Sequence, residues 1–417
     1  MLPVAASKLL IVEGVEDDPL MRARADRLRT GITTPDVRHV DDPALNRIIT
    51  GEFFPGQHNG MQGDFEPIVI FNRFRLDDSD EERQRRKEAY PALNQLKFNG
   101  YGGFDWRESG SPAYRERTGL VCQPAWAIHS VTGCHFRCAY CHLSRVLNLM
   151  LNMEDFVGRL DEWIKQCPSQ TLFQHDNYTD IVCFEPEYGG TKLLIDYFAR
   201  QPGRALELYV GKSDHVDFML DYDHQGHTVC CWSLSGRTQS TLFEYRSAPM
   251  KARIYAMRKC QEAGYPVRVR LSPIIPVRNW RDENREMIEL LFEKVSPDVV
   301  TIETIRFLDY DEMCEMFDVS LLDGEFLAAM KAAQGVEHLQ GCGVPDAFRA
   351  EVYQFLFAEL DRCAPDTPVA FCREARTMWE RFAGYFARKG QHPDRYTCNC
   401  GPYSAPASAG ELAATVR

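Results

Sequence analysis

The fold is constrained most by the alternation of short apolar runs with helical segments between residues 120 and 310. Strands that alternate with helices form a parallel sheet, here with about six βα units, and such sheets place their chemistry at the carboxyl ends of the strands. The predicted strands cover residues 125–130, 181–185, 205–210, 228–234, 266–275 and 299–304. The predicted helices cover residues 144–166, 192–199, 251–263 and 281–295.

The segments before and after this region do not show the regular strand–helix alternation. We therefore predict an α/β chain of three parts. Residues 1–118 form an N-terminal α/β region, in which the Gly-rich segment 101–117 links to the core. Residues 119–310 form the parallel barrel, and residues 311–417 form a mainly helical C-terminal region with a tail. In the C-terminal region, helices are predicted at 323–333, 349–360 and 374–389.

A group of three cysteines follows the first strand of the alternating region. The sequence G-C-H-F-R-C-A-Y-C-H places Cys134, Cys138 and Cys141 on residues 133–142. The N-terminal sequence does not have the pattern of a signal peptide, and no apolar stretch reaches the length of a membrane span. We therefore expect a cytoplasmic protein without a membrane partner, in which thiols stay reduced and the fifteen cysteines do not form a disulfide framework.

The spacing of the three cysteines indicates a metal cluster. A structural zinc site needs a fourth ligand, and no matching C-x-x-C pair follows. Three thiolates on one loop can hold three irons of a 4Fe–4S cluster. With Tyr140 before the last cysteine, the motif resembles that of radical S-adenosylmethionine (SAM) enzymes. The resemblance implies a SAM-ligated cluster, an external one-electron donor of the flavodoxin or ferredoxin kind, and a 5′-deoxyadenosyl radical that takes hydrogen from the substrate.

A closer resemblance, to the spore photoproduct lyase family, covers most of the first 375 residues. The stretches that carry it are L-L-I-V-E-G-V-E-D-D-P-L, T-G-C-H-F-R-C-A-Y-C-H-L, I-V-C-F-E-P-E-Y-G-G-T, G-K-S-D-H-V-D, C-W-S-L-S, A-G-Y-P-V-R-V-R-L-S-P-I-I-P and I-E-T-I-R-F. It implies a partial (β/α)6 radical SAM barrel in which Lys212 and Ser233 hold the polar end of SAM. Arg270, which alternates with Arg268 along a predicted strand, is a further candidate for the carboxylate or ribose of SAM.

Two positions depart from the pattern of the DNA-repair members of this family. Those members carry a hydrogen-donor cysteine after the F-E pair and a tyrosine after the third cluster cysteine. This chain has Tyr188 and His142 at these positions. A net charge of −12 without a long basic run also argues against binding to nucleic acid.

These departures favour a different substrate. The chain is similar to the radical SAM diol dehydratases of aminoglycoside antibiotic biosynthesis, such as the one that acts on paromamine in the apramycin pathway. We therefore expect a small cationic sugar, a dehydrated 1,2-diol, an NADPH-dependent reductase downstream and no nucleic acid. In this hypothesis Glu187, Glu185 or His142 accepts the hydroxyl proton, and Tyr188 donates hydrogen or positions the sugar. The alternatives are a lyase of thymine-dimer lesions in DNA and a non-catalytic iron–sulfur or zinc scaffold.

Cysteines near the C-terminus leave a second question open. Cys398 and Cys400 could join Cys372 or Cys363 in an additional metal site, although no complete set of four ligands is evident from the sequence.

Overall fold

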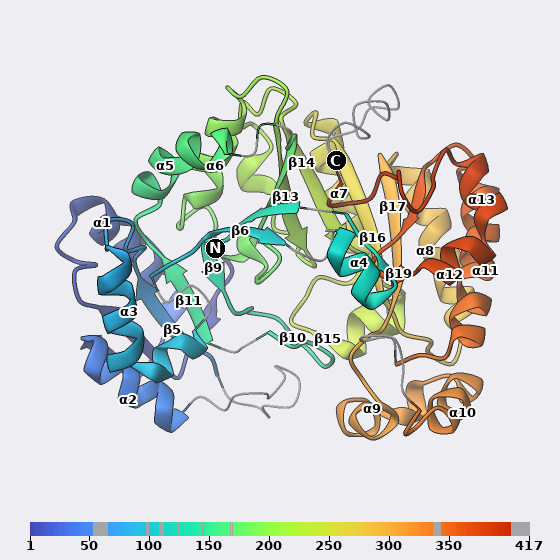
Figure 1. Ribbon diagram of the computed structural model, residues 1–417, viewed down its shortest axis with the longest axis horizontal. Coiled ribbons are helices and arrows are strands. Elements are labelled where there is room, and N and C mark those ends of the chain that lie inside the picture. The colour runs from blue at the N-terminus through green and yellow to red at the C-terminus, as the bar shows by residue number, and fades with distance from the viewer. Residues whose placement is uncertain are drawn as a thin grey trace.

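The protein is built on two sheets that lie side by side (Figure 1). The computed structural model describes residues 1–52, 66–96, 100–107, 112–123, 125–143, 146–166, 168, 170–336 and 343–401. The end of the predicted tail, residues 402–417, therefore lies outside the described residues. The larger sheet carries the helical C-terminal region, and the smaller sheet belongs mostly to the N-terminal region.

The larger sheet is a curled, mainly parallel sheet of eight strands in the order β18-β17-β16-β14-β13-β12-β8-β6. Only the edge strand β6 runs antiparallel to its neighbour β8. In order along the chain, these strands are β6 (Phe104–Arg107), β8 (Ala125–Ile128), β12 (Leu172–His175), β13 (Ala205–Gly211), β14 (Thr228–Ser233), β16 (Val267–Ile274), β17 (Val299–Thr304) and β18 (Val369–Phe371). The central strands are apolar runs that are buried along nearly their whole length, as expected when helices cover a parallel sheet. The predicted partial parallel barrel is thus confirmed.

The smaller sheet has five strands in the order β4-β2-β5-β11-β9. They are β2 (Lys8–Val12), β4 (Val37–Val40), β5 (Ile68–Asn72), β9 (Val131–Thr132) and β11 (Val146–Met150). Its helices are α1 (Pro19–Arg29), α2 (Asp42–Glu52), α3 (Asp80–Ala89) and α5 (Met153–Lys165). Helix α1 begins at Pro19, because the Asp18 side chain accepts hydrogen bonds from the backbone N–H groups of Leu20 and Met21.

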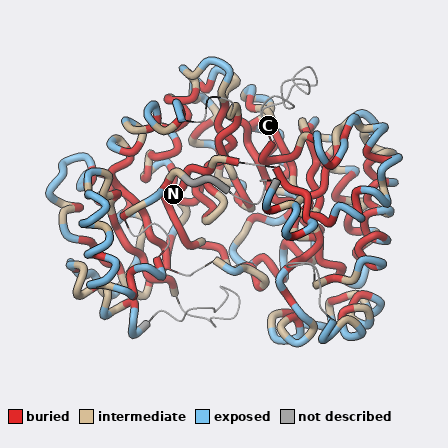
Figure 2. The backbone as a smooth tube through the Cα atoms, in the orientation of Figure 1, coloured by how far each residue is buried: buried red, intermediate tan, exposed pale blue. Residues whose placement is uncertain are grey.

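Helices cover the larger sheet and build the C-terminal region, so that buried backbone runs through the centre and exposed backbone lies at the rim (Figure 2). The barrel helices are α6 (Gly190–Phe198), α7 (Met250–Glu262) and α8 (Trp280–Lys294). The remaining helices are α4 (Pro112–Thr118), α9 (Tyr310–Met316), α10 (Gly324–Ala332), α11 (Asp346–Cys363), α12 (Arg376–Arg381) and α13 (Ala383–Arg388). None of the helices within the described ranges is both long and apolar enough to cross a bilayer.

Two predicted elements of the barrel were wrong. Residues 181–184 form a short 3-10 helix rather than a strand, because β12, which the sequence analysis missed, fills the place between β8 and β13. The predicted helix at 144–166 begins only at Met153, since the apolar run 146–150 pairs as β11 with both β5 and β9.

Two other segments also differ from the expectation. The predicted linker 101–117 contributes β6 to the barrel sheet, and β18 in the C-terminal region adds a further parallel strand. The predicted helix 374–389 is split into the short strand β19 (Glu374–Ala375), α12 and α13. The domain boundaries after residues 118 and 310 stay predictions.

Candidate active site

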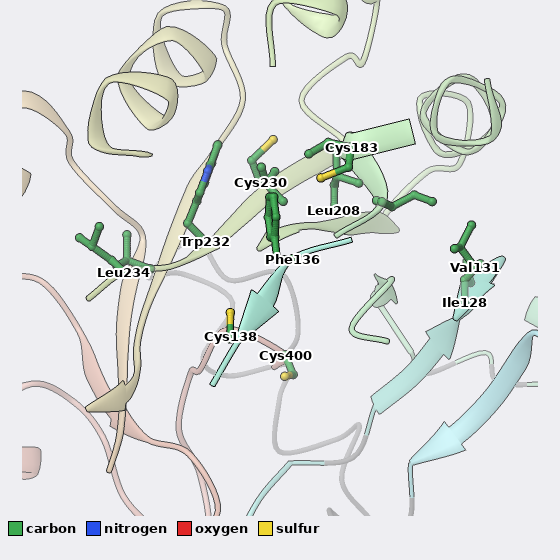
Figure 3. Close-up of a cluster of buried hydrophobic side chains, with 14 of the residues drawn as sticks. Ile128, Val131, Phe136, Cys138, Cys183, Leu208, Cys230, Trp232, Leu234 and Cys400 are labelled. Atoms are coloured by element: carbon green, nitrogen blue, oxygen red, sulfur yellow. The ribbon is translucent and has the colours of Figure 1, made fainter. Parts of the chain in front are cut away.

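The cysteine loop lies on the carboxyl side of the barrel sheet, after β8 and the short β9. Its centre, β10 (Arg137–Cys138), pairs antiparallel with β15 (Glu244–Tyr245), so that Cys138 lies opposite Glu244. The N–H of Ala139 donates to the carbonyl of Phe243 at 2.7 Å. Phe136 and Cys138 belong to the buried core that also contains Trp232 (Figure 3). The loop is therefore fixed to the end of the barrel rather than free in solvent.

The thiols of Cys134, Cys138 and Cys141, here called the loop cysteines, form a donor set that suits an iron–sulfur cluster. None of the three is in a disulfide, Cys138 is buried and the other two are half-buried. Burial raises the pKa of all three thiols, and for Cys134 the other two loop thiols add to the effect. Cationic irons would compensate this cost by stabilising the thiolates.

Among the residues that the structure describes, no group of three or more His, Cys, Asp or Glu side chains is arranged to hold a metal ion. The interpretation of the loop cysteines as cluster ligands therefore rests on their spacing in the sequence and on the presence of three thiols in one loop.

Glu244 is the centre of a buried polar network beside the loop. Its carboxylate accepts hydrogen bonds from the Tyr140 hydroxyl at 2.5 Å and from the Arg253 guanidinium at 2.5 Å. Ser235 and Gln239 complete the set at 2.9 and 3.0 Å. Burial favours the neutral acid, but Arg253 and Lys212 outweigh it and lower the pKa of Glu244 to about 2. The network fixes Tyr140 and keeps a negative charge beside the loop.

Lys212 follows β13 and lies close to the same network. Its ammonium is 5.7 Å from the centre of the Tyr140 ring, and its backbone N–H donates to Asp180 at 2.7 Å. The chain can approach Asp180 because Gly211 precedes Lys212, with a φ of +73°; a Cβ there would lie 2.5 Å from the Asp180 carboxylate. Burial raises the pKa of Asp180 to about 7.

Ser233 and Arg270 meet through a residue that the sequence analysis did not consider. The Tyr209 hydroxyl is 2.8 Å from the Ser233 hydroxyl and accepts a hydrogen bond from Arg270 at 2.7 Å. Arg270 also forms an ion pair with Glu303 at 3.3 Å. These side chains come from neighbouring strands β13, β14, β16 and β17, so the barrel brings two of the predicted SAM-binding residues together.

The structure does not bring the predicted catalytic residues to this site. Tyr188 is fully buried, and its hydroxyl donates to the carbonyl of Met150 at 2.7 Å. Glu187 forms an ion pair with the N-terminal ammonium. Burial opposes ionisation, but the hydrogen bond from that ammonium, its charge and a backbone hydrogen bond together lower the pKa of Glu187.

The two remaining predicted catalytic residues, Glu185 and His142, lie in different environments from each other. Glu185 accepts from the backbone N–H groups of Gly189 and Thr191, both at 2.7 Å, and so caps α6. His142 is exposed, with its ring 5.6 Å from that of Phe307.

Glu244, Tyr209 and Asp180 were missed because their contacts to Tyr140, Arg270 and Lys212 join residues distant in sequence. Arg253 was missed with Glu244, because its role follows from that carboxylate. The only local signal was positional: Tyr209 and Asp180 precede the G-K-S-D-H and F-E-P-E stretches that carry the resemblance.

Comparisons with known proteins agree with this architecture. The family model described as spore photoproduct lyase matches residues 122–310. The spore photoproduct lyase of Bacillus subtilis is 29% identical over 191 residues, which cover 43% of this chain and 56% of the relative. That of Clostridium acetobutylicum is 24% identical over 200 residues, or 46% of this chain and 59% of the relative. The aligned region thus spans less than two thirds of these curated relatives.

Solved structures show the same fold over a longer range. A spore photoproduct lyase variant with bound AdoMet and dinucleoside spore photoproduct has a TM-score of 0.61 at 17% identity, covering 89% of this chain and 99% of that one. Another spore photoproduct lyase, complexed with the dinucleoside spore photoproduct, gives the same TM-score at 19% identity and the same coverage. The predicted cofactors, a 4Fe–4S cluster and SAM, agree with this radical SAM family, in which one solved structure contains AdoMet.

The predicted aminoglycoside diol dehydratase is wrong, because these relatives are spore photoproduct lyases. The expectation of a small cationic sugar and no nucleic acid is wrong for the same reason, since two of the solved relatives hold a dinucleoside lesion. The roles of Tyr188, Glu187 and His142 in diol dehydration fall with that function. The family model and the curated relatives instead show that this chain is similar to spore photoproduct lyases over its barrel region, residues 122–310 for the family model.

Proposed function

We propose that this chain is a radical SAM lyase that acts on a thymine-dimer lesion of the spore photoproduct kind in DNA. The observation that carries the proposal is the position of the loop cysteines at the carboxyl end of the parallel barrel, within the region that matches the spore photoproduct lyase family. The activity and the substrate are those of the relatives, and we propose them for this chain because the curated matches cover only part of each protein.

The loop cysteines would hold the 4Fe–4S cluster, and the polar side chains beside them would hold SAM. When bound, the reduced cluster and SAM supply a 5′-deoxyadenosyl radical that removes a hydrogen atom from the substrate. Lys212 offers an ammonium to the SAM carboxylate, while Tyr140 is held in place by Glu244. Ser233 and Arg270, joined by Tyr209, offer hydrogen-bond donors from the barrel strands.

The net charge of −12 does not exclude a DNA substrate. Net charge describes the whole surface, whereas a lesion is recognised by local contacts to phosphates and bases. The contacts of Tyr188 bear on whether it could act as the hydrogen donor of the repair enzymes. Its hydroxyl is engaged with the Met150 carbonyl, and its backbone carbonyl accepts from Arg24 at 2.6 Å. A hydrogen relay through residue 188 is therefore not part of this proposal.

The test is anaerobic reaction of the iron-loaded protein with dinucleoside spore photoproduct, SAM and dithionite. We expect conversion of the lesion to the undamaged thymine dinucleoside with formation of 5′-deoxyadenosine, and no conversion by the Cys138→Ala variant. Undamaged dinucleoside serves as the substrate control. Formation of 5′-deoxyadenosine at the same rate with and without the lesion, with the lesion unchanged, would show that the substrate class is wrong.

A further inference from the structure

Four cysteines outside the loop come together between the barrel and the C-terminal segment. Cys122 directly follows the short strand β7 (Leu120–Val121), and Cys372 directly follows β18. Cys398 and Cys400 lie on the last described segment of the chain. We call these four residues the interior cysteines. None of them is in a disulfide; three are buried and Cys372 is half-buried.

Strand pairing brings the first two interior cysteines to the same place. β7 pairs antiparallel with β19, with Val121 opposite Glu374 and Leu120 opposite Ala375. Continuing this register by one residue places Cys122 opposite Arg373, the neighbour of Cys372. The N–H of Cys372 also donates to the carbonyl of Ile302 at 3.0 Å, which fixes it against β17.

The segment that carries Cys398 and Cys400 is held inside the barrel by one arginine. The Arg268 guanidinium donates to the carbonyls of Cys398, Asn399 and Gly401 at 2.9, 3.1 and 3.0 Å. The N–H of Asn399 donates to the Thr301 hydroxyl at 3.0 Å. Both Arg268 and Thr301 are fully buried, so this segment fills the interior of the sheet, where Cys400 is part of the buried cluster (Figure 3).

Gln123 connects this segment to Cys122. Its side-chain amide donates to the carbonyl of Tyr396, two residues before Cys398. On the other side of the segment, a Cβ at Gly401 would lie only 2.7 Å from the Gln123 side-chain oxygen. The residue next to Cys122 therefore contacts the segment on both sides of Cys398 and Cys400.

The thiols are close enough to affect one another. The pKa of Cys398 is raised well above its usual value, first by a hydrogen bond with Cys400, then by burial and by the thiols of Cys400, Cys122 and Cys372. Burial raises the pKa of Cys372, and Cys122 and Cys400 add to this effect. Arg270 donates to the Cys372 sulfur at 3.7 Å. The Arg270 guanidinium thus lies beside Cys372, and it also interacts electrostatically with Cys400; a nearby cation favours the thiolate form that binds metal.

We propose that Cys122, Cys372, Cys398 and Cys400 hold a second iron–sulfur cluster, independent of the one on the loop cysteines and of the proposed lesion chemistry. Four thiolates are the usual ligand set of a 4Fe–4S cluster. The cluster would fasten the C-terminal segment to the barrel.

Other cysteines of this protein, which we do not propose as cluster ligands, provide a comparison for the interior cysteines. Cys230 and Cys260 are both buried and interact between β14 and α7, and Cys231, the next residue on β14, also contributes to the raised pKa of Cys230. Cys363, which the sequence left open as a ligand, ends α11 beside Arg362, and no other cysteine contributes to its raised pKa, which burial dominates. The structure therefore favours Cys372 over Cys363 as the partner of the C-x-C pair.

The test is the iron and sulfide content of the full-length protein after anaerobic reconstitution, with visible absorption recorded on the same samples. We expect about eight irons per chain in the unchanged protein, and about four after Cys134, Cys138 and Cys141 are all changed to Ala. The double variant Cys398→Ala/Cys400→Ala should also retain about four. Cys363→Ala, the matched control, should retain the full content. A second variant, Cys400→Ser, keeps the volume of the side chain in case the double variant does not fold.

Two results would overturn the proposal. One is loss of all iron from the variant without the loop cysteines, while its fold is intact by circular dichroism. The other is one zinc per chain that disappears when Cys398 and Cys400 are replaced, because the interior cysteines would then hold a single ion instead of a cluster. Failure of lesion repair in the earlier experiment has no bearing on these measurements.

Discussion

The loop cysteines and the interior cysteines are each flanked by a buried glutamate that binds one arginine and one tyrosine. Beside the loop, Glu244 accepts from Arg253 at 2.5 Å and from Tyr140 at 2.5 Å. Beside the interior group, Glu374 accepts from Arg349 at 3.1 Å and from Tyr353 at 2.7 Å. Both glutamates lie on short antiparallel pairs that include or adjoin a cysteine.

The two regions differ in how the thiols are brought together. The loop cysteines lie within one short segment, so local chain geometry keeps them near one another before the rest of the fold forms. The interior cysteines come from three separate segments and meet only when β7, β18 and the C-terminal segment have packed. The local motif is complete in the sequence. For the interior group the sequence indicates Cys398, Cys400 and either Cys372 or Cys363, and the structure is needed to add Cys122 and to choose Cys372.

The largest expected effect separates the two groups by function. Cys138→Ala should lower SAM cleavage to the background of the reaction without protein, because the cluster loses one of only three protein ligands. Cys400→Ala should lower the iron content by about half but leave SAM cleavage measurable, since it lies outside the loop. The measurement is 5′-deoxyadenosine formed under dithionite. Equal loss of SAM cleavage in both variants would contradict the expectation that only the loop cysteines are needed for it.

The next largest effect concerns the two buried glutamates. Glu244→Gln should lower the free energy of unfolding by about 3–5 kcal/mol, because it leaves the buried Arg253 without its carboxylate. Glu374→Gln should also destabilise the protein, although Arg349 keeps an ion pair with the exposed Asp346. Glu244→Gln should cost more, since Lys212 also loses a partner charge. Urea unfolding of the metal-free variants measures both.

The pH dependence sharpens this comparison. The pKa of Glu244 is lowered from 4.5 to about 2, so its stabilisation is fully present above pH 4.5 and is lost as the pH falls toward 2. The difference between the unchanged protein and Glu244→Gln should shrink over that range. Glu289→Gln, which breaks an exposed pair with Arg362, is the control and should change stability by less than about 1 kcal/mol. A comparable decrease in the free energy of unfolding of Glu289→Gln would show that the buried pairs stabilise the protein no more than an exposed pair does.

A smaller effect tests the SAM-binding side of the loop region. Lys212→Gln should weaken SAM binding by about 10-fold to 100-fold, the value of one charge-assisted hydrogen bond of about 1.5–3 kcal/mol. Lys192→Gln is the matched control, because Lys192 is exposed and pairs with Asp196 on α6. Anaerobic equilibrium dialysis with the cluster-loaded protein gives both affinities. An unchanged affinity in Lys212→Gln would assign the carboxylate of SAM to other residues.

The smallest expected effect belongs to Tyr188. Tyr188→Phe removes the hydrogen bond to the Met150 carbonyl and should cost about 1 kcal/mol of stability. Because the hydroxyl is buried in that contact, lesion turnover should stay within about twofold of the unchanged protein. Paired unfolding and turnover measurements check this. Turnover that falls strongly with unaltered stability would restore Tyr188 as a hydrogen donor.

The sequence was sufficient for those parts of the fold that depend on local pattern. Strand–helix alternation predicted the parallel barrel. The position of the loop cysteines in the sequence predicted that they follow the first strand of that barrel. It was insufficient where pairing between distant segments decides the outcome. The run 181–184 has the composition of a strand, yet β12 already fills the adjacent place in the sheet. The pairing of Glu244 with Cys138 likewise depends on β10 and β15 meeting in the folded protein.

The substrate prediction failed for a different reason. It rested on net charge and on the two changed positions Tyr188 and His142, neither of which the structure brings to the polar network around Glu244. Because neither side chain contacts that network in the structure, the two changes did not identify the substrate.

The most direct test of the central claim is reductive cleavage of SAM by the anaerobically reconstituted, unaltered protein. If the loop cysteines hold a cluster with one iron open to SAM, dithionite should produce 5′-deoxyadenosine and methionine in equal amounts, with more than one turnover when dinucleoside spore photoproduct is supplied. An intact cluster on Cys134, Cys138 and Cys141 that leaves SAM uncleaved under these conditions would contradict the account.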